Sequence, residues 1–383
     1  MAEWIVPDYE SRFLCKCGDC RRSCCLGWNI SLSLAEYEAL CALDGPLEEM
    51  LRGAMERDGS SARFIRTDAG RCPLLQPDGL CALQKAHGET LLPEVCSAYP
   101  RIKRTEYARE IALSASCEAV CELLLSETAP LQFIPRELPI ESAQKKKTQA
   151  AYLTDELHST CMRILQNRAL TLADRIAHLH AFLRRMHAIE TEKGLAALHA
   201  AVQETDISAF SPIEIPENDW LHIALPLSIA SAFMPESSAL KAYWQPLLSA
   251  LHLPGEREKW TEDALSEAAE RYALLKERFA RKYPHHEQQF ERIMVNWAFY
   301  TRLPFSGRLS TLEEEAFSLA ACFLLVRFAS VLCADGTADS LVDIVSACMR
   351  VIEHSGFDKR CASYLRASHF GDADILQNSI LSI

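Results

Sequence analysis

Cysteines crowd one short stretch of this sequence, CKCGDCRRSCC. Five of its eleven residues are cysteine, namely Cys15, Cys17, Cys20, Cys24 and Cys25. Charged residues such as Lys16, Asp19 and Arg21 separate them, which does not suit cysteines that act only as small buried apolar side chains. Because thiolates are ligands for soft and borderline metals, the composition of this stretch indicates a metal site.

The spacing of three of these cysteines is i, i+3, i+7. On a helix, Cys17, Cys20 and Cys24 would share one face. Cys25 would point about 100° away from that face, and Cys15 is the least certain member of the group. Three thiolates do not fill a tetrahedral site, so we expect a further ligand from elsewhere in the chain.

A second group of cysteines, Cys72, Cys81 and Cys96, follows the first. The segment CPLLQPDGLC, from Cys72 to Cys81, contains the turn residues Pro77-Asp78-Gly79. Proline presets φ and glycine permits positive φ, so this loop is predicted to fold Cys72 and Cys81 back toward each other. The second group is therefore a natural source of the missing ligands.

The number of clustered cysteines limits the kind of site but does not choose it. Thiolate ligands favour zinc or iron–sulfur clusters, and each centre takes about four. Seven or eight cysteines exceed one zinc site. One cluster with spare thiols and two metal sites both fit, so the metal and its ligand set stay open at this point.

Composition excludes several functions. The chain has 383 residues, 49% hydrophobic residues, only 14 glycines and a formal net charge of −12. It contains no glycine-rich phosphate-binding motif, and its acidity argues against nucleic acid as a partner. Because MAEWIVPDYE is not a secretory signal, we expect a cytoplasmic protein, in which clustered cysteines bind metals rather than form disulfides.

The longest apolar stretch, Ala316 to Cys333, contains Arg327. A spanning helix needs ~20 apolar residues, and a charge at its centre is costly. We therefore predict a buried core helix and no transmembrane segment, and leave peripheral membrane association and oligomerisation open.

The elements that must position the cysteines are mostly helices. Capping signals stand at Ser33–Glu36, Thr171–Asp174 and Thr311–Glu314. Helical periodicity covers about 143–167, 190–204, 262–282, 286–302, 338–354 and 373–381. Eleven of the sixteen cysteines precede residue 122. We predict a mainly α protein with a cysteine-rich metal-binding domain over 1–127, a proline-containing linker over 128–142 and a helical domain over 143–383.

Three motifs together resemble the flagellin lysine N-methylase family, within a wider group of proteins with zinc- or iron-chelating cysteine clusters. They are C-x2-C-x3-C-C near the N-terminus, CPLL…GLCALQ, and EVCSAYPR, and VNWAFYTRLPF at Val295 to Phe305 also looks like the methylase branch. The resemblance implies methylation of lysine ε-amines of flagellin by S-adenosylmethionine, with a [4Fe–4S] cluster. It also implies the candidate ligands Cys17, Cys20, Cys24, Cys25, Cys72, Cys81 and Cys96.

Lysine methylation would need a group that accepts a proton, because only a neutral amine attacks a methyl sulfonium and a free lysine has a pKa of ~10.4. Polar residues that suit this role are Tyr99, Glu106, Tyr107, Asn296 and Tyr300. Neither the catalytic residue nor the methyl-donor pocket follows from the sequence. The alternatives are a non-enzymatic zinc- or iron-binding module with a structural metal and an electron-transfer protein.

Overall fold

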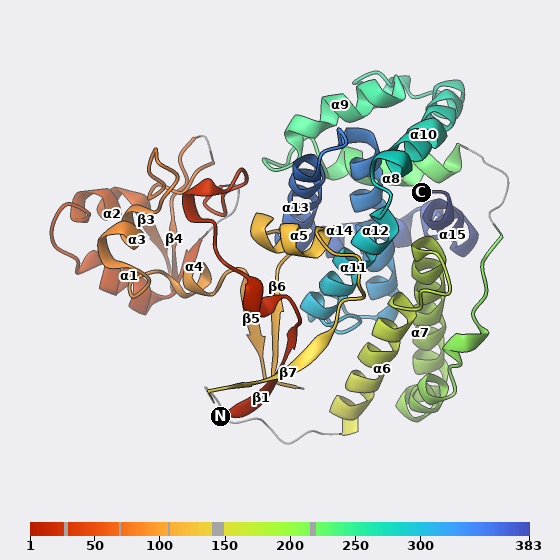
Figure 1. Ribbon diagram of the computed structural model, residues 1–383, viewed down its shortest axis with the longest axis horizontal. Coiled ribbons are helices and arrows are strands. Elements are labelled where there is room, and N and C mark those ends of the chain that lie inside the picture. The colour runs from red at the N-terminus through yellow and green to blue at the C-terminus, as the bar shows by residue number, and fades with distance from the viewer. Residues whose placement is uncertain (27–29, 69, 106–107, 140–148, 215–219) are drawn as a thin grey trace.

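The computed structural model describes residues 1–26, 30–68, 70–105, 108–139, 149–214 and 220–383. The prediction of a mainly α protein is confirmed. Figure 1 shows a small lobe standing beside a larger body of helices, with a sheet between them. We call residues 30–98 the cysteine lobe and the part from residue 118 to the C-terminus, without the strand at 133–138, the helical body.

The cysteine lobe combines four short helices with a three-stranded antiparallel sheet. The helices are α1 (Leu34–Cys41), α2 (Glu48–Ala54), α3 (Ala82–His87) and α4 (Glu94–Ala98). The sheet has the order β2-β4-β3, from Ser31–Leu32, Ser61–Phe64 and Met55–Asp58. The capping box of Ser33 and Glu36 is present, as predicted. The strands were not predicted, because each is too short to show a clear alternation.

A four-stranded sheet joins the lobe to the helical body. Its order is β5-β6-β1-β7, from Arg101–Arg104, Glu110–Leu113, Ala2–Pro7 and Phe133–Leu138. Strand β7 runs antiparallel to β1, from Ala2 opposite Leu138 to Pro7 opposite Phe133. The predicted linker at 128–142 thus contains a regular edge strand that pairs with the N-terminus, while the domain bounds themselves stay a prediction.

The helical body is built around one buried helix. Its helices are α5 (Glu118–Leu125), α6 (Gln149–Leu165), α7 (Leu172–Gln203), α8 (Leu221–Phe233), α9 (Lys241–Leu251), α10 (Glu262–Lys282), α11 (His286–Thr301), α12 (Leu312–Cys333), α13 (Ala338–His354), α14 (Phe357–Ala367) and α15 (Ala373–Ser382). Helix α12 contacts α7, α8, α9, α10, α13, α14 and α15, and Figure 1 shows it enclosed by them.

Helix α12 confirms the prediction of a core helix. Thr311 caps it by accepting a hydrogen bond from the backbone of Glu314. Among the described residues, α12 is the one helix that is both long enough and apolar enough to cross a membrane. However, 94% of its most apolar 18-residue stretch is buried inside the protein. Arg327 is buried as well, and it contacts His286 and Glu287 at the start of α11, so its charge has partners.

Among the helices that follow residue 143, α8, α9 and α14 were not predicted. Helices α8 and α9 contain Pro226 and Pro246, which remove a backbone donor and argue against a helix when the sequence is read alone. Helix α8 is apolar on most of its circumference, so it has no amphipathic period to detect. Burial in the core outweighs the cost of the two prolines.

A buried ion network between α7 and α11 gives a first testable prediction. Glu291 is fully buried and binds Arg168 and Arg175, with Arg175 Nη1 2.7 Å from Glu291 Oε2. Removing the carboxylate in Glu291→Ala leaves the buried guanidinium of Arg175 with backbone carbonyl partners but without the carboxylate that balances its charge. We expect this to lower the free energy of unfolding by about 3–5 kcal/mol, measured by urea denaturation.

The matched control is Glu277→Ala in α10, which removes one partner of an exposed ion pair with Arg281. Both side chains there are about two-thirds exposed, so the loss should stay below about 1 kcal/mol. Equal effects of the two substitutions would show that the burial of Glu291 does not matter.

Candidate metal centre

A cavity of about 200 Å³ lies between the cysteine lobe and the helical body. We call it the thiol cavity. Nine cysteines line it, namely Cys15, Cys17, Cys20, Cys24, Cys25, Cys72, Cys81, Cys96 and Cys117. The structure thus brings together all seven candidate ligands, adds Cys15, and adds Cys117, which the sequence analysis did not select. All sixteen cysteines of the chain are described and free of disulfides.

The predicted shared helical face of Cys17, Cys20 and Cys24 is wrong. Residues Cys17–Asp19 form a single 3-10 turn, Cys17 has a positive φ of 52°, and Cys20 is already extended. The segment from Cys15 to Cys25, which we call the thiol loop, therefore has no continuous helix. Its cysteines reach one cavity because tertiary contacts hold the loop.

The turn between Cys72 and Cys81 forms as predicted. The backbone of Gln76 donates to Leu80, and Leu75 pairs with Cys81 in an isolated bridge. Gly79 has a φ of 80° and lies against Gly18 of the thiol loop. A Cβ added at Gly79 would lie 2.9 Å from the Gly18 carbonyl oxygen, so this close backbone contact requires glycine.

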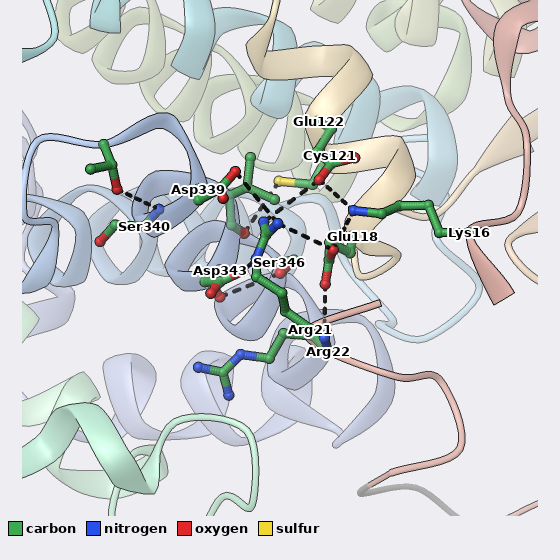
Figure 2. Close-up of polar contacts among 12 residues, drawn as sticks. Lys16, Arg21, Arg22, Glu118, Cys121, Glu122, Asp339, Ser340, Asp343 and Ser346 are labelled. Atoms are coloured by element: carbon green, nitrogen blue, oxygen red, sulfur yellow. Dashed lines mark hydrogen bonds and ion pairs between the residues drawn. The ribbon is translucent and has the colours of Figure 1, made fainter. Parts of the chain in front are cut away.

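Basic residues of the thiol loop hold it against the first turn of α5 (Figure 2). Glu118 is 1% exposed, and its carboxylate accepts hydrogen bonds from Lys16 Nζ at 2.6 Å and from the Arg22 backbone at 2.7 Å. Lys16 also binds Glu122 at 2.7 Å. A buried carboxylate with charged partners on both sides fixes this end of the loop.

Arg350 of α13 binds the other side of the thiol loop. Its guanidinium donates to the carbonyl oxygens of Arg22 at 3.0 Å and Ser23 at 3.1 Å, and to Ser116, next to Cys117, at 3.3 Å. One planar side chain therefore fixes the distance between the thiol loop and the start of α5.

The thiols are poor metal ligands until they lose their protons. Burial raises the pKa of Cys20 to about 12 and that of Cys72 to about 11. Cys25 is the exception, because a hydrogen bond from Cys24 lowers its pKa to about 7. A metal must displace these protons, so metal binding is expected to weaken as the pH falls.

The chemistry of the donor set suits a thiolate-bound centre. Among the described residues, no group of three or more His, Cys, Asp or Glu side chains is already arranged to hold a metal ion. The cavity is also more than ten times the ~10–15 Å³ that one water-sized sphere occupies. Nine soft sulfur ligands around a wide space match iron–sulfur chemistry, which uses thiolates spread around a larger group.

A buried polar network begins at the wall of the thiol cavity. The hydroxyl of Tyr99, a cavity residue, pairs with Ser116 Oγ at 3.0 Å, and Ser116 pairs with Ser114 and with His354 Nε2. Ser114 donates to Oε2 of Glu353. Burial raises the pKa of Glu353 to about 7, and its Oε1 has no hydrogen-bond partner among the described residues.

The residues that were expected to accept a proton lie in different environments. Tyr99 belongs to this network, whereas Asn296 is buried and binds Tyr9 and the carbonyl of Leu113. Burial raises the pKa of Tyr300, so its hydroxyl stays protonated at neutral pH and cannot act as a base. Glu106 and Tyr107 lie outside the described residues. Glu353 was not predicted from the sequence, because nothing in its local pattern distinguishes it from a surface glutamate on α13.

Loss of the Arg350 contacts should weaken metal retention. In Arg350→Met the carbonyls of Arg22, Ser23 and Ser116 lose their common donor, so the thiol loop can move away from Cys117. Outer contacts of this kind alter metal affinity by ~10–100-fold, and we expect a fall of that size in competition with a chelator. Arg360→Met, which removes an exposed arginine bound to the Ala232 carbonyl, should leave affinity unchanged. Equal affinity of both variants would contradict the role of Arg350.

With a mainly α body and a cysteine-lined cavity described, comparison with known proteins gives the family. Residues 158–376, more than half of the chain, match the model of the FliB lysine N-methylase C-terminal domain. The chain therefore belongs to the FliB lysine N-methylase family, as the sequence motifs indicated.

Individual relatives are similar over shorter stretches. The lysine-N-methylase of Salmonella typhimurium strain LT2 is 30% identical over 156 residues, which are 37% of this chain and 39% of that protein. That of Salmonella choleraesuis strain SC-B67 is 29% identical over the same shares. The flagellar biosynthetic protein FliU of Salmonella muenchen is 29% identical over 129 residues, 32% of this chain and 76% of that protein. The chain thus aligns with about two fifths of each lysine-N-methylase, and no solved structure matches it.

Proposed function

We propose that this protein is a cytoplasmic enzyme that transfers methyl groups from S-adenosylmethionine to lysine ε-amines of flagellin, with a [4Fe–4S] cluster in the thiol cavity. Membership of the family supports the methylation of lysine. The names of the relatives, lysine-N-methylase and flagellar biosynthetic protein, support a flagellar substrate. The nine cysteine side chains support the cluster.

One observation carries this proposal. Arg350, which holds the thiol loop against Ser116, lies inside the region that matches the methylase C-terminal domain. The domain that defines the family therefore contacts the thiol loop, which forms part of the cavity wall. A metal bound in the cavity would be positioned by the same helix, α13, that carries Glu353.

The residues around the cavity can hold the cluster and control its surroundings. The candidate ligands that the family resemblance implies are Cys17, Cys20, Cys24, Cys25, Cys72, Cys81 and Cys96, and all of them line the cavity. When bound, such a cluster supplies iron and one-electron chemistry. Phe13, Leu80 and Leu83 are apolar residues of the same wall, and they limit the access of water to the ligands.

The polar network offers a route for the lysine proton. A lysine at the cavity must lose its proton before it attacks the methyl group. Burial keeps the hydroxyl of Tyr99 neutral by raising its pKa, so Tyr99 can relay a proton but does not store one. Glu353, with a pKa of about 7, can accept the proton through Ser116 and Ser114 at neutral pH.

A methylation assay tests the proposal. Protein purified without oxygen is incubated with flagellin and S-adenosylmethionine carrying an isotopically labelled methyl group, and peptides are analysed by mass spectrometry. We expect labelled lysines in flagellin and none when the protein is omitted. Bound metal without any labelled lysine would overturn the methylase proposal.

A structural metal is the second candidate, and one observation favours it. Cys72, Cys81 and Cys96 pack against the small core of the cysteine lobe, so a metal there would also stabilise the lobe. Stoichiometric zinc without acid-labile sulfide, together with no methyl transfer, would select this reading. Reversible reduction without consumption of S-adenosylmethionine would select an electron-transfer protein instead.

A further inference from the structure

The nine cysteines of the thiol cavity belong to two different parts of the molecule. Cys117 packs against the large core of the helical body. Cys72, Cys81 and Cys96 pack against the separate core of the cysteine lobe. The thiol loop, which carries the other five cysteines, contacts both parts. Because one thiolate centre takes about four cysteines, the number and the placement both allow two centres.

The first part of the thiol loop is fixed to the helical body. Lys16 and the backbone of Arg22 bind Glu118, the residue after Cys117. Arg21 Nε donates to Asp343 of α13 at 2.8 Å (Figure 2). These contacts lie on either side of Cys20, so they hold this part of the loop against the start of α5, where Cys117 lines the same cavity.

The last residue of the thiol loop is fixed to the cysteine lobe instead. The backbone N–H of Cys72 donates to the carbonyl of Cys25 at 2.8 Å, and Leu26 pairs with Arg71 in an isolated bridge. The turn at residues 76–80 brings Cys81 back toward Cys72. Cys25 thus extends the row of cysteines that the lobe presents.

We propose that the thiol cavity holds two thiolate metal centres with four cysteine ligands each. The inner centre, on the helical body, has Cys15, Cys20, Cys24 and Cys117 as ligands. The outer centre, on the cysteine lobe, has Cys25, Cys72, Cys81 and Cys96. The inference rests on the proposed presence of a resident metal, deepens the proposed function, and does not require methyl transfer for its test.

This division has two consequences. Cys24 and Cys25 are adjacent in sequence and belong to different centres, so the two centres are neighbours. Cys17 is left over. Its turn lies against the loop of the lobe at Gly79, and its thiol contacts the backbone of Cys15 rather than the second group. Cys17→Ser should therefore retain both centres, although Cys17 is among the ligands that the family resemblance implies.

The test is a metal count on three single variants purified without oxygen. Iron, zinc and acid-labile sulfide are measured per chain for the wild type, Cys117→Ser, Cys72→Ser and Cys41→Ser, and the reduced samples are examined by electron paramagnetic resonance. We expect each of Cys117→Ser and Cys72→Ser to lose about half of the wild-type metal and a different part of its spectrum. Cys41, an exposed cysteine of α1 outside the cavity, should be dispensable.

Three results would overturn the inference: a wild-type content of one centre per chain, a Cys117→Ser variant with the full metal content, or complete loss of metal in either variant. Circular dichroism identifies a variant that fails to fold, and Cys117→Ala then replaces it. If the wild-type protein transfers no methyl group while each variant has half of the wild-type metal, the proposed function is refuted. The inference of two centres then still holds.

Discussion

Removal of the proposed metal from the thiol cavity is expected to unfold the cysteine lobe and abolish the proposed methyl transfer while the helical body stays folded. The core of the lobe has ten buried residues: Ile30, Leu32, Leu40, Leu51, Ala54, Met55, Ala62, Phe64, Leu74 and Leu83. A core of this size contributes only about 3–5 kcal/mol to the free energy of unfolding of the lobe. Three of the cysteines pack against it, so metal binding and folding of the lobe should be coupled.

Hydrogen exchange measured by mass spectrometry tests this expectation on metal-loaded and chelator-treated protein. Amides of β3 and β4 in the lobe should lose protection when the metal is removed, whereas amides of α12, which is enclosed by other helices, should keep it. Equal protection of β3 and β4 in both samples would show that the lobe folds without metal, and uniform loss would show that the protein unfolds as one unit.

The second large effect is expected for Glu353→Gln. The amide keeps the size of the side chain and can accept the hydrogen bond from Ser114, but it cannot accept a proton. If Glu353 takes up the lysine proton, methyl transfer should fall by about 10²–10⁴-fold, the usual contribution of a positioned base. Metal content should be unchanged, because Glu353 does not line the cavity.

The pH dependence distinguishes a base from a structural residue. Glu353 interacts electrostatically with Tyr9, Tyr300 and Arg308, and His354 Nε2 lies 3.9 Å from its Oε2. Burial lowers the pKa of His354 to about 4, so it stays neutral near pH 7. The rate of the wild-type protein should therefore rise with pH through about 7, as Glu353 loses its proton, and the variant should lack this rise.

The free energy of unfolding should change with pH in the direction opposite to the rate. The folded-state pKa of Glu353, about 7, lies above its ordinary value of 4.5, so between these values the folded protein keeps a proton that the unfolded chain releases. The contribution of Glu353 to the free energy of unfolding thus falls as the pH rises from about 4.5 to about 7. Glu353→Gln removes this fall.

The matched control is Glu315→Gln. Burial raises the pKa of Glu315 to about 7 as well, and its carboxylate binds Ser306 rather than the network. This variant should show the same pH effect on stability and keep its methyl transfer. Equal losses of activity in both variants would contradict the role of Glu353.

Local signals predicted much of this fold because they need no knowledge of distant residues. The N-caps at Ser33, Thr171 and Thr311 start helices where the sequence indicated. The amphipathic periods of α10, α11, α13 and α15 were read within a few residues of their bounds. The turn before Cys81 also follows from its own proline and glycine, since one short segment contains all the interactions it needs.

The rest depends on contacts between distant segments. Strand β1 pairs with β7 more than 120 residues away, and neither has a marked alternation. The spacing of Cys17, Cys20 and Cys24 suits one face of a helix, but the shape of the thiol loop is set by Glu118 and Arg350. Cys117 follows the polar stretch SAS at the start of a helix, a signal for a cap, and only the tertiary fold places its thiol in the cavity.

The most direct measurement is the methylation of flagellin inside cells. Flagellin is produced in a host that has no lysine methylase of this family, alone, with this protein, or with a variant in which Cys20 and Cys72 are both serine, and its lysines are analysed by mass spectrometry. We predict methyl-lysine only when the wild-type protein is present. Unmodified lysines beside metal-loaded wild-type protein, or methyl-lysine beside the double variant, would contradict the account.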